Sequence, residues 1–265
     1  MQKALLAIDC GTTRIKYILK DKGALSFVSQ GNIDNIEQII DNYRYNNKEL
    51  EVLILGTNAK LLNLSVKTTN YDELICTAHL PLYYNCNNAL VVNIGTGTAF
   101  LSIQNNNFRH LIGTGLGGGT LLGLSQRFLC TENVYIINEL SRFGKLEAIN
   151  TTIEDVQYNN VSWLDKSMTV SNFSKQANSQ SDIAAGIISL VIEPIISICK
   201  SLVIGQNYER VYFAGSVLDF NLARELIEKY SSLLEIDSVI IEKYEYGTLL
   251  GALAYYNKLN VENEI

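Results

Sequence analysis

Two apolar runs of the chain each lead into a glycine-containing segment that could bind phosphate groups. The first run, Ala4–Ile8, is followed by Asp9-Cys10-Gly11-Thr12-Thr13, and the second, Leu90–Ile94, by Gly95-Thr96-Gly97-Thr98. Glycine has no Cβ atom, so the backbone N–H groups at these positions can approach an anion closely. We therefore predict that both segments bind a polyphosphate, through Gly11, Thr12, Thr13, Gly95 and Thr96.

A third glycine-rich segment runs from Gly113 to Gly119 and precedes a helix-like stretch, 120–129. A helix start favours a bound anion through its dipole and its N–H groups, so this segment is a further candidate phosphate site. Its spacing also fits the dinucleotide fingerprint, but it follows a hairpin and not the first strand of a βαβ unit. A purely structural role for these glycines in turns and bulges stays open. The chain contains no G-x-x-x-x-G-K-[ST] motif, which excludes a P-loop.

The first two segments belong to a longer internal repeat. Each is followed by a predicted hairpin, over 14–28 in the first copy and over 100–112 in the second, and Asp9 of the first copy matches Asn93 of the second. A repeat of a whole supersecondary unit predicts two similar lobes. Two phosphate-binding hairpins that face each other would clamp a polyphosphate between those lobes.

The rest of the pattern predicts a mixed α/β fold, because strands alternate with helices. Helices are expected over 133–143 and 147–156, an irregular connection over 159–169, and a long helix from Asp182 to Ile204. We predict an N-terminal lobe formed by residues 1–75 together with 247–265, and a C-terminal lobe formed by residues 76–246.

Composition narrows the functional classes. With 265 residues, of which 47% are hydrophobic and 18% charged, the chain is long and apolar enough to form buried cores. A net charge of −6 gives no support for binding to nucleic acid or to anionic membranes. The 5 cysteines never form a C-x-x-C motif, which favours a reducing compartment without a zinc site, and the N-terminus lacks a signal-peptide pattern. We therefore expect a cytoplasmic protein.

One apolar stretch, Ile183–Ile204, imitates a membrane span in its length. It contains Glu193, Pro194 and Lys200. A helix that is apolar on most faces is better interpreted as buried between lobes or in a subunit interface. We predict no membrane span, and a homodimer formed through this helix.

Six motifs, in this order along the chain, resemble the type II pantothenate kinases of the actin-like ATPase superfamily, to which acetate and sugar kinases also belong. They are IDCGTTRIK, ILGTNA, YDE, VNIGTGTAF, RHLIGTGLGGGTLLGL and VYFAGS. The resemblance implies a two-lobed actin-like ATPase (ribonuclease H-like) α/β fold with duplicated phosphate-binding hairpins. It also implies that the protein binds ATP and Mg²⁺ and phosphorylates the hydroxyl group of pantothenate, the first step of coenzyme A biosynthesis.

Positions shared with this family imply the roles of single residues. Asp9 would lie near the γ-phosphate and Mg²⁺, Glu73 would be the general base, and Lys16 could neutralise phosphate charge. The other nucleotide contacts would come from later motifs, through Gly117, Gly118, Gly119, Gly215 and Ser216. Phosphoryl transfer needs positioned phosphates, Mg²⁺ and a carboxylate that accepts the hydroxyl proton. The three charged residues also have structural interpretations, as a turn former, an exposed helix start and a solvated strand residue.

An acceptor site is implied as well, formed by Thr96, Thr98, Ala99, Arg109, His110 and Gly113. The family has a serine in place of Ala99 and a substrate-binding arginine in place of His110. Replacing an arginine that binds a carboxylate with two hydrogen bonds costs roughly 1.5–3 kcal/mol of binding free energy. Arg109 is adjacent, but neighbouring residues of a strand face opposite ways. Thr12 also replaces a glycine that is usual in the first turn.

Two other functions stay open on the sequence. The same scaffold could phosphorylate another small hydroxyl acceptor, such as an amino sugar. It could also be a catalytically weak nucleotide-binding regulator, which Ala99 and His110 favour and which the presence of Asp9 and Glu73 opposes.

Overall fold

A computed structural model of the chain describes residues 3–11, 14–46, 48–59, 62–156, 165–176 and 179–263. The chain divides into two compact units. The first unit comprises Met1–Val91, Leu101–His110 and Tyr246–Ile265, and the second comprises Val92–Phe100 and Leu111–Glu245. The lobes expected from the sequence, 1–75 with 247–265 and 76–246, stay a prediction.

The first unit contains a five-stranded mixed sheet. Its strands are β1 (Ala4–Cys10), β2 (Ile15–Asp21), β3 (Ala24–Gly31), β4 (Leu50–Leu55) and β5 (Thr68–Asn70), in the order β3-β2-β1-β4-β5. Strands β1, β2 and β3 are antiparallel neighbours, whereas β4 runs parallel to both β1 and β5. The predicted hairpin is present, and its turn has positive φ at Lys22 (49°) and Gly23 (85°), as in type I′ turns.

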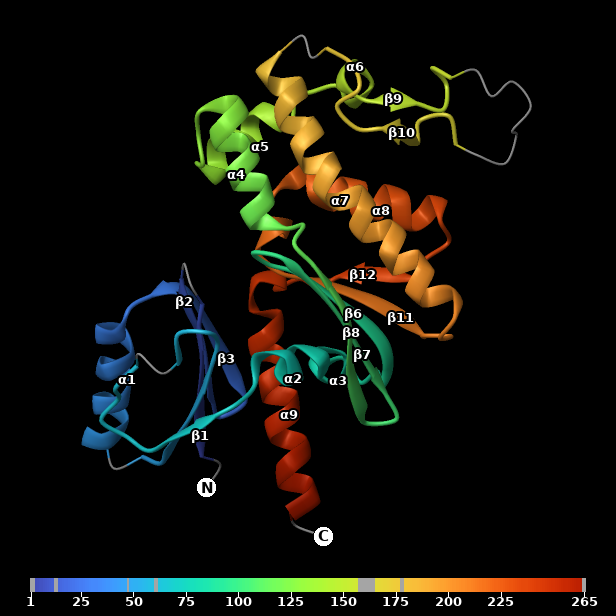
Figure 1. Ribbon diagram of the computed structural model, residues 1–265. Coiled ribbons are helices and arrows are strands. Elements are labelled where there is room, and N and C mark those ends of the chain that lie inside the picture. Colours follow the sequence, from blue (N-terminus) through green and yellow to red (C-terminus); the bar gives the residue numbers. More distant parts are fainter. Residues whose placement is uncertain are drawn as a thin grey trace. The chain divides into compact units, whose positions relative to one another are not determined.

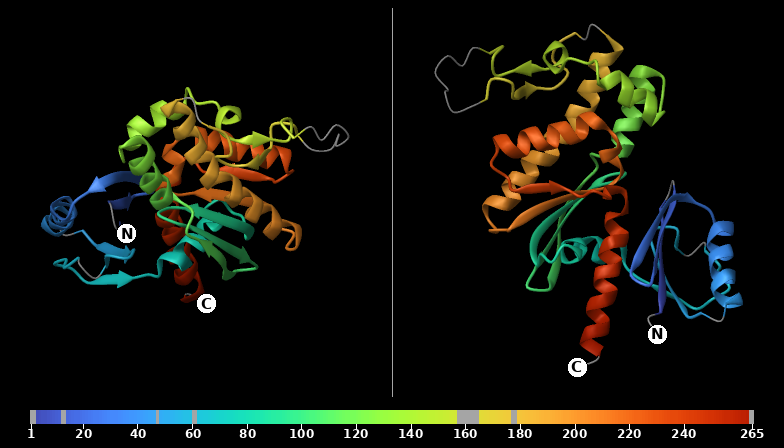
Figure 2. Two further views of the ribbon diagram at one scale, coloured as in Figure 1. Left: turned by 45° about the horizontal axis from the view of Figure 1, so that its top comes forward. Right: turned by 180° about the vertical axis from the view of Figure 1, so that it is seen from behind.

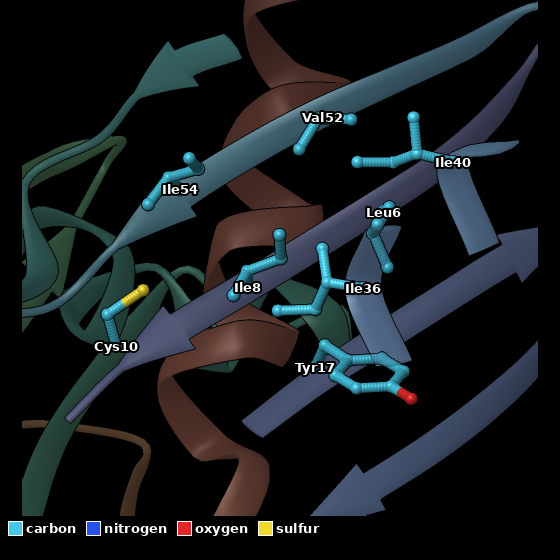
Figure 3. Close-up of a cluster of buried hydrophobic side chains, with 8 residues drawn as sticks. All are labelled: Leu6, Ile8, Cys10, Tyr17, Ile36, Ile40, Val52 and Ile54. Carbon is cyan, nitrogen blue, oxygen red and sulfur yellow. The ribbon is translucent and has the colours of Figure 1, made fainter. Parts of the chain in front are cut away.

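Successive side chains of β1 face opposite sides of the sheet, so the apolar core residues and the candidate active-site residue Asp9 lie on different faces. Leu6, Ile8 and Cys10 point to the face that α1 (Ile33–Tyr45) covers, where they pack against Ile36 and Ile40 (Figure 3). Because successive strand residues face opposite sides, Leu5, Ala7 and Asp9 lie on the other face of the sheet. The α1 face is therefore a closed apolar layer, and the polar residue Asp9 is left to the opposite face.

The second sheet repeats this topology. Its strands are β6 (Asn88–Ile94), β7 (Thr98–Gln104), β8 (Asn107–Thr114), β11 (Arg210–Ala214) and β12 (Ser238–Ile240), in the order β12-β11-β6-β7-β8. If β6 is matched with β1, this order is the order of the first sheet. The second hairpin also turns through two residues of positive φ, Asn105 (48°) and Asn106 (67°). The internal repeat predicted from the sequence is thus confirmed.

Two glycines mark equivalent points of the repeat. Gly56 follows β4 with φ of 95°, and a Cβ atom there would lie 2.8 Å from the backbone of Cys10. Gly215 follows β11 with φ of 110°, and its Cβ would lie 2.4 Å from the carbonyl oxygen of Ile94. Both positions combine a positive φ with a backbone approach that leaves no room for a side chain. In each sheet, therefore, a crossover strand passes close to the end of the central strand.

Helices of the second unit surround one long apolar helix. They are α4 (Gly118–Leu129), α5 (Val134–Ser141), α6 (Leu146–Ile149), α7 (Gln180–Ile204) and α8 (Asn221–Leu233), with one 3₁₀ helix, η2 (Ser216–Asp219). Figure 2 shows α7 and α8 side by side, and α7 also contacts α4, α5 and α6. Among the described residues, α7 alone is long and apolar enough to cross a membrane, with a mean hydropathy of 2.1. Core helices pass the same test, and the contacts of α7 are those of a core helix.

Helix α7 begins slightly earlier than expected from the sequence. Ser179 is its N-cap, and its Oγ accepts a hydrogen bond from the backbone N–H of Asp182 at 3.1 Å. Asp182 is buried in the first turn, and its Oδ1 accepts from the N–H of Lys145 at 2.9 Å. Asp182 Oδ2 also accepts from Ser179 Oγ at 2.8 Å, so the carboxylate holds both the helix start and the loop that precedes α6.

The helix expected over 147–156 is wrong. Helix α6 ends at Ile149, and the chain continues into β9 (Thr151–Thr152), which pairs with β10 (Thr169–Ser171). Asn150 is fully buried, donates to Asn172 Oδ1 at 3.1 Å and accepts from the N–H of Phe173 at 3.0 Å. These side-chain bonds favour an extended residue over a further helical turn. Residues 159–164 of the expected irregular connection lie outside the described residues.

The first unit is completed by the last helix of the described chain. Helices α2 (Glu73–Ala78) and α3 (Leu80–Tyr83) pack against α9 (Gly247–Asn263), which begins after the 3₁₀ helix η3 (Tyr244–Tyr246) (Figure 1). The hydroxyl oxygens of Thr77 and Thr248 lie 3.0 Å apart. A Cβ atom on Gly251 would lie 1.9 Å from the carbonyl oxygen of Cys76, so α2 and α9 cross at backbone contact.

Candidate active site

Asp9 and Lys16 form an ion pair at the end of β1. They are directly opposite in the antiparallel register of β1 and β2, and Lys16 Nζ lies 3.7 Å from Asp9 Oδ2. Asp9 is only 7% exposed. A buried carboxylate needs a compensating charge or hydrogen bonds, and Lys16 supplies the charge. The structure thus places two of the predicted phosphate-site residues together.

Glu73 is brought to the same edge of the sheet. Strands β1, β4 and β5 are parallel, so Asp9, Gly56 and the segment after Asn70 all lie at the carboxyl edge. The N–H of Tyr71 continues the pairing by donating to the carbonyl of Ile54 at 2.9 Å. Asp72 then caps α2 by accepting from the N–H of Ile75 at 3.0 Å, which leaves Glu73 as the first helical residue.

The electrostatics of the two carboxylates are coupled. Burial raises the pKa of Asp9 above its usual value, although the Lys16 ammonium opposes this rise. The pKa of Glu73 is raised first by burial and then by the negative charge of Asp9, with a further contribution from Asp72, while Lys16 lowers it. A carboxylate with a raised pKa is a stronger base, so the environment of Glu73 suits a group that accepts a proton.

A loop after β4 closes around Asp9, and the sequence analysis did not identify it as part of the site. A Cβ atom on Gly56 would lie 2.7 Å from Asp9 Oδ1. Asn58 then braces the first turn, donating from its backbone to the carbonyl of Cys10 at 3.0 Å and from Nδ2 to that of Gly11 at 3.2 Å. The signal was available in the repeat, since LILG (53–56) and YFAG (212–215) both place a glycine directly after an apolar strand. Thr12 and Thr13 lie outside the described residues.

Backbone hydrogen bonds join the start of α4 to the second glycine turn, the segment Gly95–Thr98 that follows β6. The N–H of Gly118 donates to the carbonyl of Gly95 at 2.7 Å, and the N–H of Gly119 donates to that of Thr96 at 2.9 Å. A Cβ on Gly117 would lie 2.7 Å from the carbonyl oxygen of Thr96. Glycine is required here for close contact between two loops. The amides of Gly118 and Gly119 are thus already engaged, and a phosphate role for residues 117–119 stays a prediction.

Gly215 and Ser216 lie beside this second turn. Gly215 contacts the backbone of Ile94, and its N–H donates to the carbonyl of Tyr244 at 2.9 Å. Ser216 begins η2 and is exposed. A Cβ on Gly118 would lie 3.5 Å from Val217 Cγ2, which joins the same helical turn to the glycine loop. The structure therefore brings together the residues of unit two that the sequence predicts for a nucleotide site, and their contacts with adenosine stay a prediction.

The residues predicted for the acceptor site differ in their surroundings. Thr98 is buried, and its hydroxyl donates to the carbonyl of Leu116 at 2.8 Å. Ala99 is half-buried, whereas Thr96, Arg109, His110 and Gly113 are exposed. The Phe108 ring lies 6.0 Å from the ring of His79, so alternation along β8 puts His110 on the face of β8 that His79 contacts and Arg109 on the other face. Which of them binds an acceptor stays a prediction.

Metal binding would depend on oxygen ligands. In the described part of the chain, no three or more side chains of His, Cys, Asp or Glu gather in a metal-binding group. Mg²⁺ usually binds through one or two carboxylates together with substrate phosphates and water. Asp9, a buried carboxylate that pairs with Lys16, fits such a shared site.

Comparison with known proteins gives one family and close functional relatives. The model of the family described as Fumble matches residues 20–253. A type II pantothenate kinase of Bacillus cereus (strain ATCC 10987) is 29% identical over 272 residues, which cover 96% of this chain and 98% of that protein. A type II pantothenate kinase of Bacillus anthracis is also 29% identical over 272 residues, with the same coverage of both chains.

Solved structures share the fold at lower identity. The activator of the 2-hydroxyisocaproyl-CoA dehydratase from Clostridium difficile, solved with bound ADPNP, superposes with a TM-score of 0.62 at 16% identity, covering 99% of this chain and 98% of that one. Component A of the (R)-2-hydroxyglutaryl-CoA dehydratase of Acidaminococcus fermentans gives 0.62 at 20% identity, covering 97% and 99%. Together with the two sheets of equal topology, these similarities confirm the predicted actin-like ATPase fold.

Proposed function

The chain belongs to the Fumble family, and from this premise we propose that it transfers the γ-phosphate of ATP to the hydroxyl group of pantothenate. The full-length similarity to type II pantothenate kinases supports this acceptor. The observation that carries the chemistry is the group formed by Asp9, Lys16 and Glu73 at one edge of the first sheet.

Glu73 accepts the proton of the acceptor hydroxyl as the oxygen attacks the γ-phosphorus. Its raised pKa, caused by burial and by Asp9, makes it a better base than an exposed glutamate. The γ-phosphate leaves ADP and forms a bond to the hydroxyl oxygen, so each turnover gives ADP, a phosphomonoester and a proton on Glu73. Lys16 places one positive charge beside this group of anions, where it offsets part of their repulsion.

We propose that Asp9 holds Mg²⁺ together with the nucleotide phosphates. A bound Mg²⁺ neutralises charge on the phosphate oxygens during transfer. The fit rests on the oxygen chemistry of the Asp9 carboxylate and on its position at the carboxyl edge of β1. In the first unit the nucleotide phosphates would contact the turn near Gly11, and a phosphate role for Gly95 and Thr96 of the second unit stays a prediction.

Assembly as a homodimer in the cytoplasm completes the proposal. The interface would be the side of α7 that its own unit leaves partly uncovered, comprising Leu190, Pro194, Ser197, Ser201 and Ile204. These positions recur every three or four residues and so lie along one side of the helix. All 5 cysteines are thiols, which is typical of proteins in reducing compartments.

An assay of ADP release by the purified chain tests the proposed function. Pantothenate should stimulate ADP release in the presence of ATP and Mg²⁺, and the product should carry one phosphate by mass spectrometry. Amino sugars, which represent the alternative acceptor class, should give only the background rate. Stimulation by an amino sugar and not by pantothenate would assign a different acceptor to the same scaffold. Hydrolysis without any acceptor effect would point to a nucleotide-binding regulator.

A further inference from the structure

A surface pocket lies at the amino edge of the first sheet, away from the candidate active site. It has a volume of about 220 Å³ and is lined by Lys3, Lys20, Lys22 and Leu5 together with Tyr256 and Asn257 of α9. All of these residues belong to the first unit. We name this the lysine pocket.

Strand register explains why Lys20 lies beside Leu5 in this pocket. Lys20 is the direct partner of Leu5 in the β1–β2 pair, just as Lys16 is the partner of Asp9. Leu5 and Asp9 lie on the same face of β1, and four residues of strand separate them by roughly 13 Å. The lysine pocket and the Asp9–Lys16 pair therefore occupy opposite ends of one sheet face.

The charges of the pocket are only partly compensated. Lys3 pairs with Glu51 at 3.4 Å and with Glu49 at 3.6 Å, and the Tyr256 hydroxyl also donates to Glu51. Neither Lys20 nor Lys22 forms an ion pair with any residue that the structure describes. Two ammonium groups thus remain available in a concave site, in a protein whose net charge is −6.

We propose that the lysine pocket binds a phosphate group. Ammonium groups are point charges with three donors each, and a phosphate has several acceptor oxygens and close to two negative charges at neutral pH. The side-chain amide of Asn257 adds neutral N–H donors, whereas the Tyr256 hydroxyl already donates its proton to Glu51. The pocket is smaller than the sites that enclose whole drug-sized ligands, so it fits inorganic phosphate or the phosphate end of a small phosphomonoester.

The test is a titration followed by NMR at the amide of Gly23, which lines the pocket. Inorganic phosphate and glycerol 3-phosphate are added separately to the full chain, without nucleotide or Mg²⁺, and acetate serves as the carboxylate control. Saturable shifts of the Gly23 resonance with phosphate, and much weaker ones with acetate, are expected. Binding of both phosphates identifies the phosphate group as the ligand, whereas binding of inorganic phosphate alone restricts the site to the free ion.

Two double variants decide whether the lysines are responsible. Lys20→Gln with Lys22→Gln should weaken the binding at Gly23 by about tenfold or more, because charge-assisted hydrogen bonds are lost. Lys48→Gln with Lys67→Gln removes two exposed lysines outside the pocket and should leave this binding unchanged. Lys16→Gln should also leave it unchanged, since Lys16 lies at the other end of the sheet. Equal binding in the parent and in the Lys20/Lys22 variant, shifts that never saturate, or equal shifts with acetate would each overturn the proposal.

Discussion

At the scale of single residues, the position of Glu73 at the start of α2 leads to the first prediction. Glu73→Gln should lower turnover roughly 10²–10⁴-fold while the affinity for ATP stays nearly unchanged, because the amide cannot accept the proton. Asp72→Asn is the matched control, because asparagine also caps helices; at a pH above the acid limb of the profile its turnover should stay near that of the parent. Turnover is measured as ADP release and affinity by calorimetry. If Glu73→Gln turns over like the parent, Glu73 is not the base.

The raised pKa of Glu73 predicts an acid limb in the pH profile. The ionised form is the base, so kcat/KM should rise with pH through an apparent pKa above that of an ordinary glutamate. Asp72→Asn removes a charge that raises this pKa and should move the limb to lower pH. Lys16→Gln removes a charge that lowers it and should move the limb to higher pH. If the acid limb lies at the same pH in both variants as in the parent, it does not arise from the titration of Glu73.

The ionised carboxyl of Asp9 should be needed for turnover but should lower the stability of the nucleotide-free protein. Because burial raises its pKa, the folded state binds more protons than the unfolded state at pH values between the unfolded pKa and the raised one. The free energy of unfolding therefore falls as pH rises through that window, and at neutral pH the ionised carboxyl destabilises the nucleotide-free protein.

Asp9→Asn should accordingly melt higher than the parent at pH 7, by about 2–4 °C for each 1 kcal/mol gained, and should lose this advantage below pH 4. Its turnover should fall strongly, because the proposed Mg²⁺ site would lose its charged ligand. Melting is followed by scanning fluorimetry across pH. A variant that melts below the parent at every pH would show that the Lys16 pair outweighs the cost of burial.

At the scale of elements, the crossing of α2 and α9 depends on one glycine. Gly251→Ala places a Cβ atom 1.9 Å from a backbone oxygen of α2, so the free energy of unfolding should fall by about 1–3 kcal/mol or more. Turnover should fall with it, since α2 carries Glu73. Gly123→Ala in α4 meets nothing within 4 Å and should instead stabilise the protein by roughly 0.5–1 kcal/mol through helix propensity. Denaturant titrations compare the two variants. If the two variants were equally stable, α2 and α9 would not cross at backbone contact.

Sequence reasoning succeeded where the determinant is local. The two hairpins were predictable because their turns use Lys22-Gly23 and Asn105-Asn106 at positions of positive φ. It failed at 147–156, where buried hydrogen bonds of Asn150 to residues more than 20 positions away end α6. The contact at Gly251 could not be predicted from the sequence, because nothing local indicates that α2 passes against it.

The candidate site was predictable in its residue types and only partly in its contacts. Asp9 and Glu73 could be named from the sequence because the repeat and the family motifs mark them. The roles of Gly56 and Asn58 around Asp9 depend on parallel pairing of β1 and β4, which is a contact between distant segments. The bonds of Gly118 and Gly119 to the second turn depend likewise on a contact across the hairpin.

At the scale of the whole molecule, light scattering tests the proposed dimer. The parent should have twice the monomer mass of 29.5 kDa at micromolar concentration. Ser197→Glu with Ser201→Glu introduces two charges on the uncovered side of α7 and should shift the mass to that of the monomer. Ser232→Glu, on an exposed position of α8, is the control and should leave the mass unchanged. A monomeric parent, or a dimer that tolerates both glutamates, would remove α7 from the interface.

The packing of α9 against β1 and α2 also has a consequence for biosynthesis. Strand β1 leaves the ribosome early, whereas α9 follows only after residues 92–245 have been made. At roughly 5–20 residues per second, translation of that stretch takes on the order of ten seconds. During this interval the sheet face that bears Leu5 and Asp9 lacks its covering helix. The nascent first unit therefore waits incompletely covered, and this is the period in which a chaperone would be of use to it.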